Sequence, residues 1–199
     1  MRKAIIALGV LAVTAAVVVV GILQTRDGAS EPPRRALRPL SLAEVSRPLP
    51  GTPPELAALR RRVNELRPGG PAALDAQLLA LRGYPVVVNV WASWCGPCIV
   101  ELPVLQRQAL KFGTQVAFLG VNSGDNRADA RRLSARFPMP YPSIEDPRQA
   151  VTGEYDAVGL PATAFYDGRG KRVVHQGPYT DEAQLSADIE RYALGAAGP

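Results

Sequence analysis

Cys95 and Cys98 are the only two cysteines of the chain, and they flank a Gly-Pro pair in the segment Trp94-Cys95-Gly96-Pro97-Cys98. Thiols at this spacing can close a structural disulfide, contribute to a metal site or exchange with other thiols. A disulfide that closes so short a loop restricts the unfolded chain only slightly, so it is a poor structural staple. A metal site needs about four ligands, and beyond these cysteines the chain offers one histidine, His175. The spacing therefore favours redox exchange and predicts no resident metal.

The surroundings of the two cysteines predict that one thiol attacks and the other resolves. Residues 85–91 form a continuous apolar, β-branched run typical of a buried strand, and a helical period runs from Cys95 to about Phe112. Cys95 would then lie at the start of the helix, where free backbone N–H groups and the helix dipole stabilise a thiolate. We therefore expect Cys95 to be the nucleophile and Cys98, one turn inside the helix, to resolve the mixed disulfide.

Three neighbouring residues complete the expected site. Pro97 at an early helical position loses no hydrogen bond and fixes the turn between the sulfurs. Gly96 leaves room beside the attacking sulfur, and Trp94 directly precedes it. We expect Trp94, Gly96 and Pro97 to border the bound substrate.

The elements that must position these residues alternate along the chain. The residue patterns predict helices over 54–66 and 72–83, a strand over 85–91, a helix from Cys95 to about Phe112, a strand over 116–122, helices over 126–137 and 148–156, a hairpin of 162–167 with 171–176, and a closing helix over 181–194. This order predicts an α/β fold in which helices cover both faces of a mixed central sheet.

The positive charge of the chain is concentrated at one end. The formal net charge is +5, and residues 1–70 contain 11 Lys and Arg against 5 Asp and Glu, whereas residues 71–199 contain 12 against 13. A nucleic-acid-binding domain would carry its basic residues on the folded part, so the charge distribution argues against a nucleic-acid partner. The excess of positive residues in this region is interpreted together with the apolar segment that lies among them.

Residues 4–23 contain no charged side chain and are long enough, as a helix, to cross the roughly 30 Å apolar core of a bilayer. A cleaved signal peptide is the alternative, but its apolar region usually spans about 7 to 15 residues. We therefore expect a transmembrane signal-anchor over 4–23 that contacts membrane lipid, after a cytoplasmic head of residues 1–3. Positive residues on both sides of the span leave its orientation open, and a redox motif suits the extracytoplasmic side.

Three further parts follow the expected anchor. Residues 24–53 are rich in Pro and Arg and predict an extended stalk. Residues 54–73 predict a helical extension, and residues 74–195 form the expected main domain. The protein would thus be a single-pass cell-membrane protein, or a secreted protein if the segment is cleaved.

The buried strand followed by WCGPC, together with VGLPATAFYD at 158–167, resembles the membrane-anchored TlpA/ResA-like thiol–disulfide oxidoreductases of the thioredoxin superfamily. The resemblance spans about residues 74–194 and implies a thioredoxin fold. It implies that Pro161 is cis and stands against the disulfide, and that the backbone of Leu160 is offered to an extended substrate. It also implies that Glu101 relays protons to the thiols, with a solvated first-turn glutamate as the alternative. Thioredoxin has an aspartate at the position of Asn89.

The function implied by this resemblance is thiol–disulfide exchange with extracytoplasmic proteins, with no cofactor beyond the Cys95–Cys98 disulfide. The favoured direction is reduction, as in cytochrome c-type biogenesis or general cell redox homeostasis, with electrons from a membrane-embedded thiol reductase. A non-enzymatic module that captures extended polypeptides at Leu160 and Pro161 is the alternative. One departure stands out, because family members usually begin with a β-hairpin where residues 54–83 here predict helices.

Overall fold

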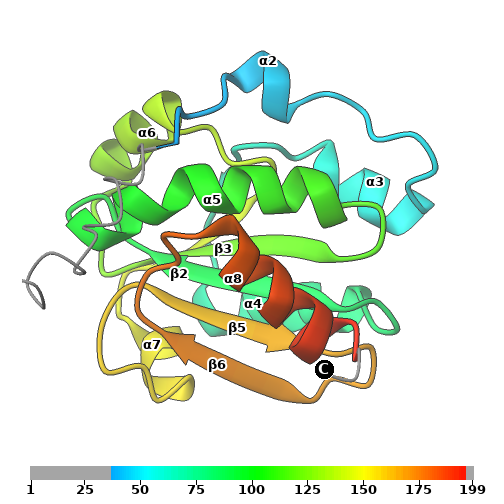
Figure 1. The fold of residues 1–199 in the computed structure, drawn as a ribbon. Helices are drawn as coiled ribbons and strands as arrows, with labels where there is room; N and C mark the ends of the chain where they lie inside the picture. The colour runs from blue at the N-terminus through cyan, green and yellow to red at the C-terminus, as the bar shows by residue number, and fades with distance from the viewer. Residues whose placement is uncertain (1–36, 196–199) are drawn as a thin grey trace, which may run out of the picture. The chain divides into compact units, whose positions relative to one another are not determined.

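A six-stranded mixed sheet forms the centre of the computed structural model, which describes residues 37–195 (Figure 1). The strand order is β1-β4-β3-β2-β5-β6. The bounds are β1 (Leu66–Arg67), β2 (Val86–Trp91), β3 (Ala117–Ser123), β4 (Ser143–Asp146), β5 (Ala162–Tyr166) and β6 (Arg172–Gln176). The first four strands in this order are parallel, and β5 and β6 are antiparallel to their neighbours. The predicted mixed sheet is confirmed.

Helices cover both faces of the sheet, as Figure 1 shows. One face packs against α5 (Gly96–Phe112), α6 (Arg127–Arg136), α8 (Glu182–Asp188) and the π-helical turn η1 (Ile189–Ala193). The other packs against α4 (Gly70–Ala80) and α7 (Ala150–Glu154). Side chains alternate along β2, so Val87 and Trp91 face α5 while Val86, Val88 and Val90 face α4 and α7. The same alternation directs Asn89 towards α5.

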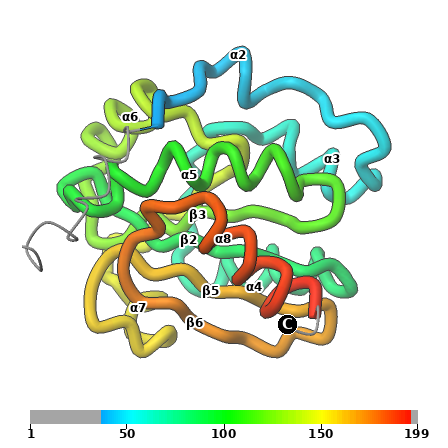
Figure 2. The backbone as a smooth tube through the Cα atoms, viewed as in Figure 1, coloured from blue at the N-terminus to red at the C-terminus, as the bar shows by residue number. Residues whose placement is uncertain are grey.

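The segment before β1 is folded onto the domain. It contains α2 (Leu42–Val45) and α3 (Pro54–Arg60), and Figure 2 shows this stretch running along the outer side of α5. Gln106 of α5 accepts a hydrogen bond from Leu40 N at 2.8 Å and donates to Leu40 O at 3.2 Å. Val45 is fully buried. Residues 37–53 are therefore not the extended stalk that composition predicted, because α5 supplies partners for their backbone.

Some elements were missed or differ in length. The short helix α2 and the strands β1 and β4 were not predicted, and α3 ends at Arg60 instead of continuing to residue 66. Asn64 explains this end, because its backbone adopts a positive φ of 60° and its side chain turns to Ser134 O and Met139 N. No helix within residues 37–195 is long and apolar enough to span a membrane. The predicted span 4–23, the head 1–3 and residues 24–36 lie outside the described residues.

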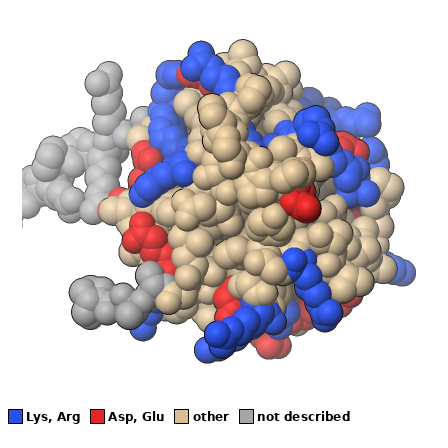
Figure 3. Space-filling model, turned by 90° about the vertical axis from the view of Figure 1, so that its right-hand side faces the viewer, with Lys and Arg blue, Asp and Glu red and all other residues tan. Residues whose placement is uncertain are grey.

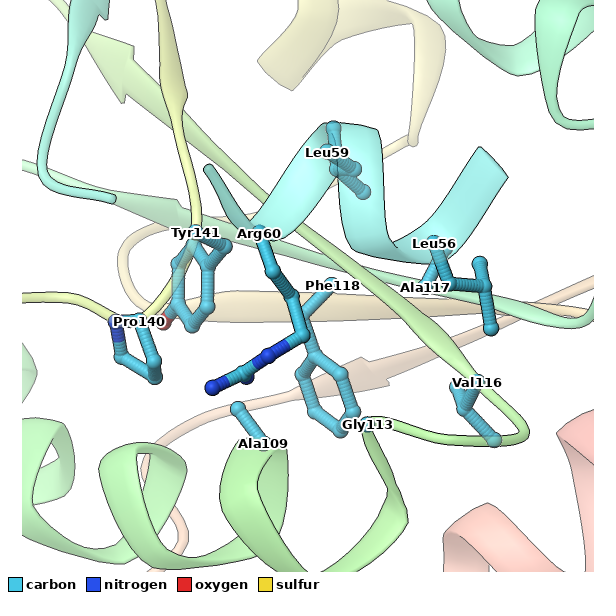
Figure 4. A pocket seen from close by; sticks show the side chains of 10 residues that line it. All are labelled: Leu56, Leu59, Arg60, Ala109, Gly113, Val116, Ala117, Phe118, Pro140 and Tyr141. Atoms are coloured by element: carbon cyan, nitrogen blue, oxygen red, sulfur yellow. The ribbon is translucent and has the colours of Figure 1, made fainter. Parts of the chain in front are cut away.

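A cavity of about 10 Å³ lies between α3 and α5 (Figure 4). Figure 4 shows the Arg60 guanidinium pointing towards α5 beside Tyr141 and Pro140. This guanidinium donates hydrogen bonds to Arg47 O at 3.0 Å and Val45 O at 3.4 Å, which fastens the segment before β1. No predicted site residue lines the cavity, so we interpret it as a packing gap.

The face of the domain at the carboxyl end of α5 is shown in Figure 3. Lys and Arg side chains gather there in separate groups, with Asp and Glu between them and uncharged surface over much of the face. This face carries no continuous basic stripe of the kind that follows a nucleic-acid backbone.

Candidate active site

The two cysteines lie at the junction between β2 and α5, as the sequence predicted. After β2 ends at Trp91, the chain makes a turn in which Cys95 N donates to Ala92 O at 3.2 Å. Cys95 is the N-cap of α5, and its sulfur accepts a hydrogen bond from Cys98 N at 3.2 Å. A backbone N–H of the first helical turn therefore points at the Cys95 sulfur, and it would stabilise the thiolate once the disulfide opens.

Cys95 and Cys98 form a disulfide with a Cα–Cα distance of 5.3 Å. Cys95 is 4% exposed and Cys98 is completely buried. The neighbouring Gly96 and Pro97 are exposed, and Trp94 is 61% exposed. Cys95 is therefore slightly more accessible to solvent than Cys98, which fits the predicted division of roles.

Glu101 lies one turn after Cys98 and is fully buried. One carboxylate oxygen accepts a hydrogen bond from Tyr179 N at 2.9 Å, and the other accepts one from the side-chain nitrogen of Asn89. Burial raises the pKa of Glu101 to about 8, while these two hydrogen bonds act in the opposite direction. The alternative of a solvated first-turn glutamate is therefore wrong.

The Leu160–Pro161 peptide is cis, as the resemblance implied. Pro161 is buried, and its carbonyl oxygen accepts a hydrogen bond from Gly177 N at 3.0 Å. It leads directly into β5, which pairs with β2 so that Ala162 faces Val90 across the strands. Leu160 is half-buried against the core. The structure thus brings the Leu160–Pro161 strand end beside the strand that leads to Cys95.

Residues 69–175, more than half of the chain, match the model of the AhpC/TSA family. The chain belongs to this family. A 91-residue stretch is 41% identical to the thiol:disulfide interchange protein DsbE of Pseudomonas fluorescens biotype C, covering 45% of this chain and 49% of that protein. Over 120 residues the chain is 31% identical to the thiol-disulfide oxidoreductase ResA of Geobacillus kaustophilus, covering 59% and 66%. The chain thus spans about half to two thirds of these relatives.

Solved structures place this AhpC/TSA-family chain in the same fold. A crystal structure described as a DsbE-type thiol:disulfide interchange protein from Chlorobium tepidum is 28% identical, with a TM-score of 0.53 over 56% of this chain and 82% of that one. A structure of MTB dsbF in mixed oxidized and reduced forms is 26% identical, with a TM-score of 0.54 over 57% and 84%. The fold is thioredoxin-like.

Several contacts within the site of this family member were not predicted from the sequence. Tyr179 holds Glu101 through a backbone N–H, which leaves no signal in the side-chain pattern. Asn89 also approaches Thr163 Oγ1, at 3.4 Å, and so connects Glu101 to β5. Asn89 was noted from the sequence as the position of the thioredoxin aspartate, but its contact with Glu101 was not predicted. Asp125, which binds Ser93 beside the motif, gave no signal in the sequence.

Within residues 37–195, no group of three His, Cys, Asp or Glu side chains is placed to hold a metal ion. His175 stacks on Tyr179 with ring centroids 4.2 Å apart. The histidine is thus a packing neighbour of the loop that contacts Glu101.

Proposed function

We propose that the protein is a thiol–disulfide oxidoreductase that exchanges the Cys95–Cys98 pair with cysteines of other proteins. The observation that carries this proposal is the asymmetric disulfide at the start of α5, where Cys95 is 4% exposed and Cys98 is completely buried, with the buried Glu101 one turn later in the same helix. The relatives named as thiol:disulfide interchange proteins support the same activity.

The reaction in the reducing direction has two steps. The Cys95 thiolate attacks one sulfur of a client disulfide, and the other client sulfur leaves as a thiolate that takes up a proton. The Cys98 thiol then loses its proton and attacks the Cys95 sulfur, which releases the second client thiolate. Two electrons pass from the enzyme dithiol to the client, and the Cys95–Cys98 disulfide forms.

Glu101 serves the second step in this proposal. Cys98 is buried, so its proton cannot pass directly to bulk water when the thiolate forms. Glu101 lies on the same helix one turn later, and its pKa of about 8 lets it accept and release a proton near neutral pH. Asn89 and Tyr179 hold its carboxyl group in place.

The client would lie across an exposed surface beside the disulfide. Trp94 is 61% exposed and Val158, close to the cis-proline, is 94% exposed. An extended chain can pair with the backbone of Leu160 while apolar side chains cover these two residues. We therefore propose protein substrates with extended segments around their cysteines.

We also propose that the enzyme is membrane-tethered, faces the extracytoplasmic side and acts as a reductant in cytochrome c-type biogenesis or general disulfide reduction. A membrane-embedded thiol reductase would supply its electrons. The support is the uncharged segment 4–23 and the Gly-Pro pair between the cysteines, which thioredoxin-like reductants share. A reporter fused after Pro199 would establish the side of the membrane.

The activity is tested by turnover and by trapping. The wild-type chain should catalyse reduction of a protein disulfide by dithiothreitol, and Cys95→Ser should abolish this catalysis. Cys98→Ser should accumulate a mixed disulfide through Cys95, which is then the sole cysteine of the chain. A wild-type chain that neither turns over nor yields a trapped complex contradicts the proposal. Client capture that persists in Cys95→Ser without turnover in the wild type would instead indicate the capture module.

A further inference from the structure

We propose that Asp125 is a positioning residue for the attacking sulfur, an inference that rests on the proposed exchange at Cys95. Asp125 lies in the loop between β3 and α6. Its carboxylate accepts hydrogen bonds from Ser93 N at 2.6 Å and Ser93 Oγ at 2.7 Å. It also accepts from Asn122 Nδ2 and Asn126 N, both at 2.7 Å. All these donors approach within charge-assisted hydrogen-bond distance.

The same loop holds both central residues of the turn that leads to Cys95. This turn is closed by the hydrogen bond from Cys95 N to Ala92 O, so Ser93 and Trp94 are its middle residues. Asp125 binds Ser93, and Gly124 O accepts a hydrogen bond from the Trp94 indole at 3.0 Å. Two adjacent loop residues therefore fix the backbone and the aromatic ring directly before the nucleophile.

The contacts of Asp125 with Ser93 and of Gly124 with Trp94 matter most when the Cys95–Cys98 disulfide is broken. In the oxidised protein the covalent bond to Cys98 restrains Cys95. In the dithiol and in the mixed disulfide that restraint is absent, and the direction of the Cys95 sulfur depends on the turn at Ser93 and Trp94. Small misplacements of a reacting atom slow a reaction strongly. Asp125 thus keeps the sulfur at the start of α5 during attack.

A structural role is the competing explanation, because Asp125 also ties Asn122 and Asn126 together within its own loop. A loss of loop structure alone would lower the free energy of unfolding of the protein. It would leave the reactivity of the folded thiolate unchanged. Kinetics of the folded protein therefore separate the two roles.

The test measures attack by Cys95 on glutathione disulfide in the full chain carrying Cys98→Ser. The reaction forms one mixed disulfide and releases one glutathione thiolate, and Trp94 fluorescence follows it. The rate constant is taken at high pH, where it no longer rises, so that the fraction of ionised thiol does not contribute. Asp125→Ala is compared with Asp129→Asn, which removes the same charge from α6 without touching Ser93.

We expect Asp125→Ala to lower this rate constant about tenfold and Asp129→Asn to leave it nearly unchanged. Ser93→Ala should give a smaller loss because the backbone bond remains, and Ser93→Thr should restore the rate. The double variant Ser93→Ala/Asp125→Ala should be no slower than Asp125→Ala alone, because the two substitutions act on the same Ser93–Asp125 interaction.

The inference is overturned if Asp125→Ala reacts within about twofold of Asp129→Asn when both are folded. If Asp125→Ala does not fold, the difference between Ser93→Ala and Ser93→Thr decides, and equal rates for these two overturn it. A parent protein that does not react with glutathione disulfide would instead contradict the proposed exchange activity.

Discussion

At the scale of single residues, the site depends on Glu101, because its surroundings contain groups that favour the protonated form and groups that favour the ionised form of its carboxyl group. Burial favours the protonated form of Glu101, and the N–H groups of Asn89 and Tyr179 favour the ionised form. The side-chain oxygen of Asn89 is buried and has no hydrogen-bond partner among the described residues. A rotation of the Asn89 amide would offer this oxygen to a protonated Glu101. Asn89 can therefore serve both states of the carboxyl group.

Glu101→Gln should slow the exchange by removing the group that accepts the Cys98 proton. We expect turnover at pH 7 to fall by about a hundredfold, the lower end for loss of a general base. The pH–rate profile should also lose its inflection near pH 8, which the Glu101 pKa places there. Steady-state reduction of a protein disulfide, followed from about pH 6 to about pH 9, measures both the fall in turnover and the loss of the inflection. Glu190→Gln, at an exposed position of η1, is the control.

Glu101 also makes the free energy of unfolding depend on pH. The pKa of Glu101 rises from 4.5 to about 8 on folding, so between these values the folded chain keeps a proton that the unfolded chain has released. Its contribution to stability is complete below the lower value and is lost as the pH rises through the upper one. The free energy of unfolding should therefore fall with rising pH, by at most about 1.4 kcal/mol per unit.

Urea unfolding at several pH values measures this slope. Glu101→Gln cannot ionise, so its free energy of unfolding should vary less over the same range. A variant with the same slope as the wild type would show that another group causes it.

Residue types predicted the reacting groups better than their partners. Cys95 and Cys98 were predicted because their chemistry resides in the side chain, whereas the cis form of Pro161 was implied by the family resemblance. Tyr179 was not found, since its contribution is a backbone N–H that any residue could supply at that place. The burial of Glu101 was also open, because its position after Cys98 fitted both a buried and a solvated side chain.

At the scale of elements, the segment before β1 is attached to α5 by a buried amide. Gln106 bonds both backbone groups of Leu40 and donates to Pro138 O at 2.7 Å. Gln106 is fully buried. Arg107 of the same helix donates to Arg38 O at 2.8 Å. These contacts make residues 37–53 a part of the folded domain.

Gln106→Leu should therefore destabilise the domain. The change leaves Leu40 N, Leu40 O and Pro138 O without their buried partner, and we expect a loss of about 2 to 4 kcal/mol in the free energy of unfolding. Urea unfolding measures it, with Gln184→Leu at an exposed position of α8 as the control. A loss below about 1 kcal/mol would contradict the role given to this contact.

Strands and helices with a strong apolar pattern were predicted, and those fixed by distant contacts were not. The strands β2 and β3 are buried along their whole length, so continuous apolar runs identified them. The strand β4 follows a stretch with three prolines, and β1 has two residues paired to it. These two short strands are defined by tertiary pairing more than by local pattern. The four-residue helix α2 is different, because it begins with a local capping box between Ser41 and Glu44, and this sequence signal was overlooked.

At the scale of the whole molecule, the Cys95–Cys98 motif and the thioredoxin-like fold account for the proposed chemistry. The direction of electron flow depends on the relative free energies of the dithiol and disulfide forms. The helix N-terminus would stabilise a Cys95 thiolate once the disulfide is reduced. The buried Glu101 and Cys98 disfavour charge inside the domain in the reduced form. These opposing effects act on the same couple, and the Gly-Pro pair between the cysteines is shared with thioredoxin, a reductant.

The reduction potential of the Cys95–Cys98 couple in the full chain tests the central claim most directly. The protein is equilibrated in thiol–disulfide buffers, and Trp94 fluorescence reports the fraction oxidised. We predict a reversible two-electron couple below about −230 mV, in the range of reductants. A couple near −120 to −180 mV would contradict the proposed role as a reductant, and a protein without a reversible couple would contradict thiol–disulfide exchange itself.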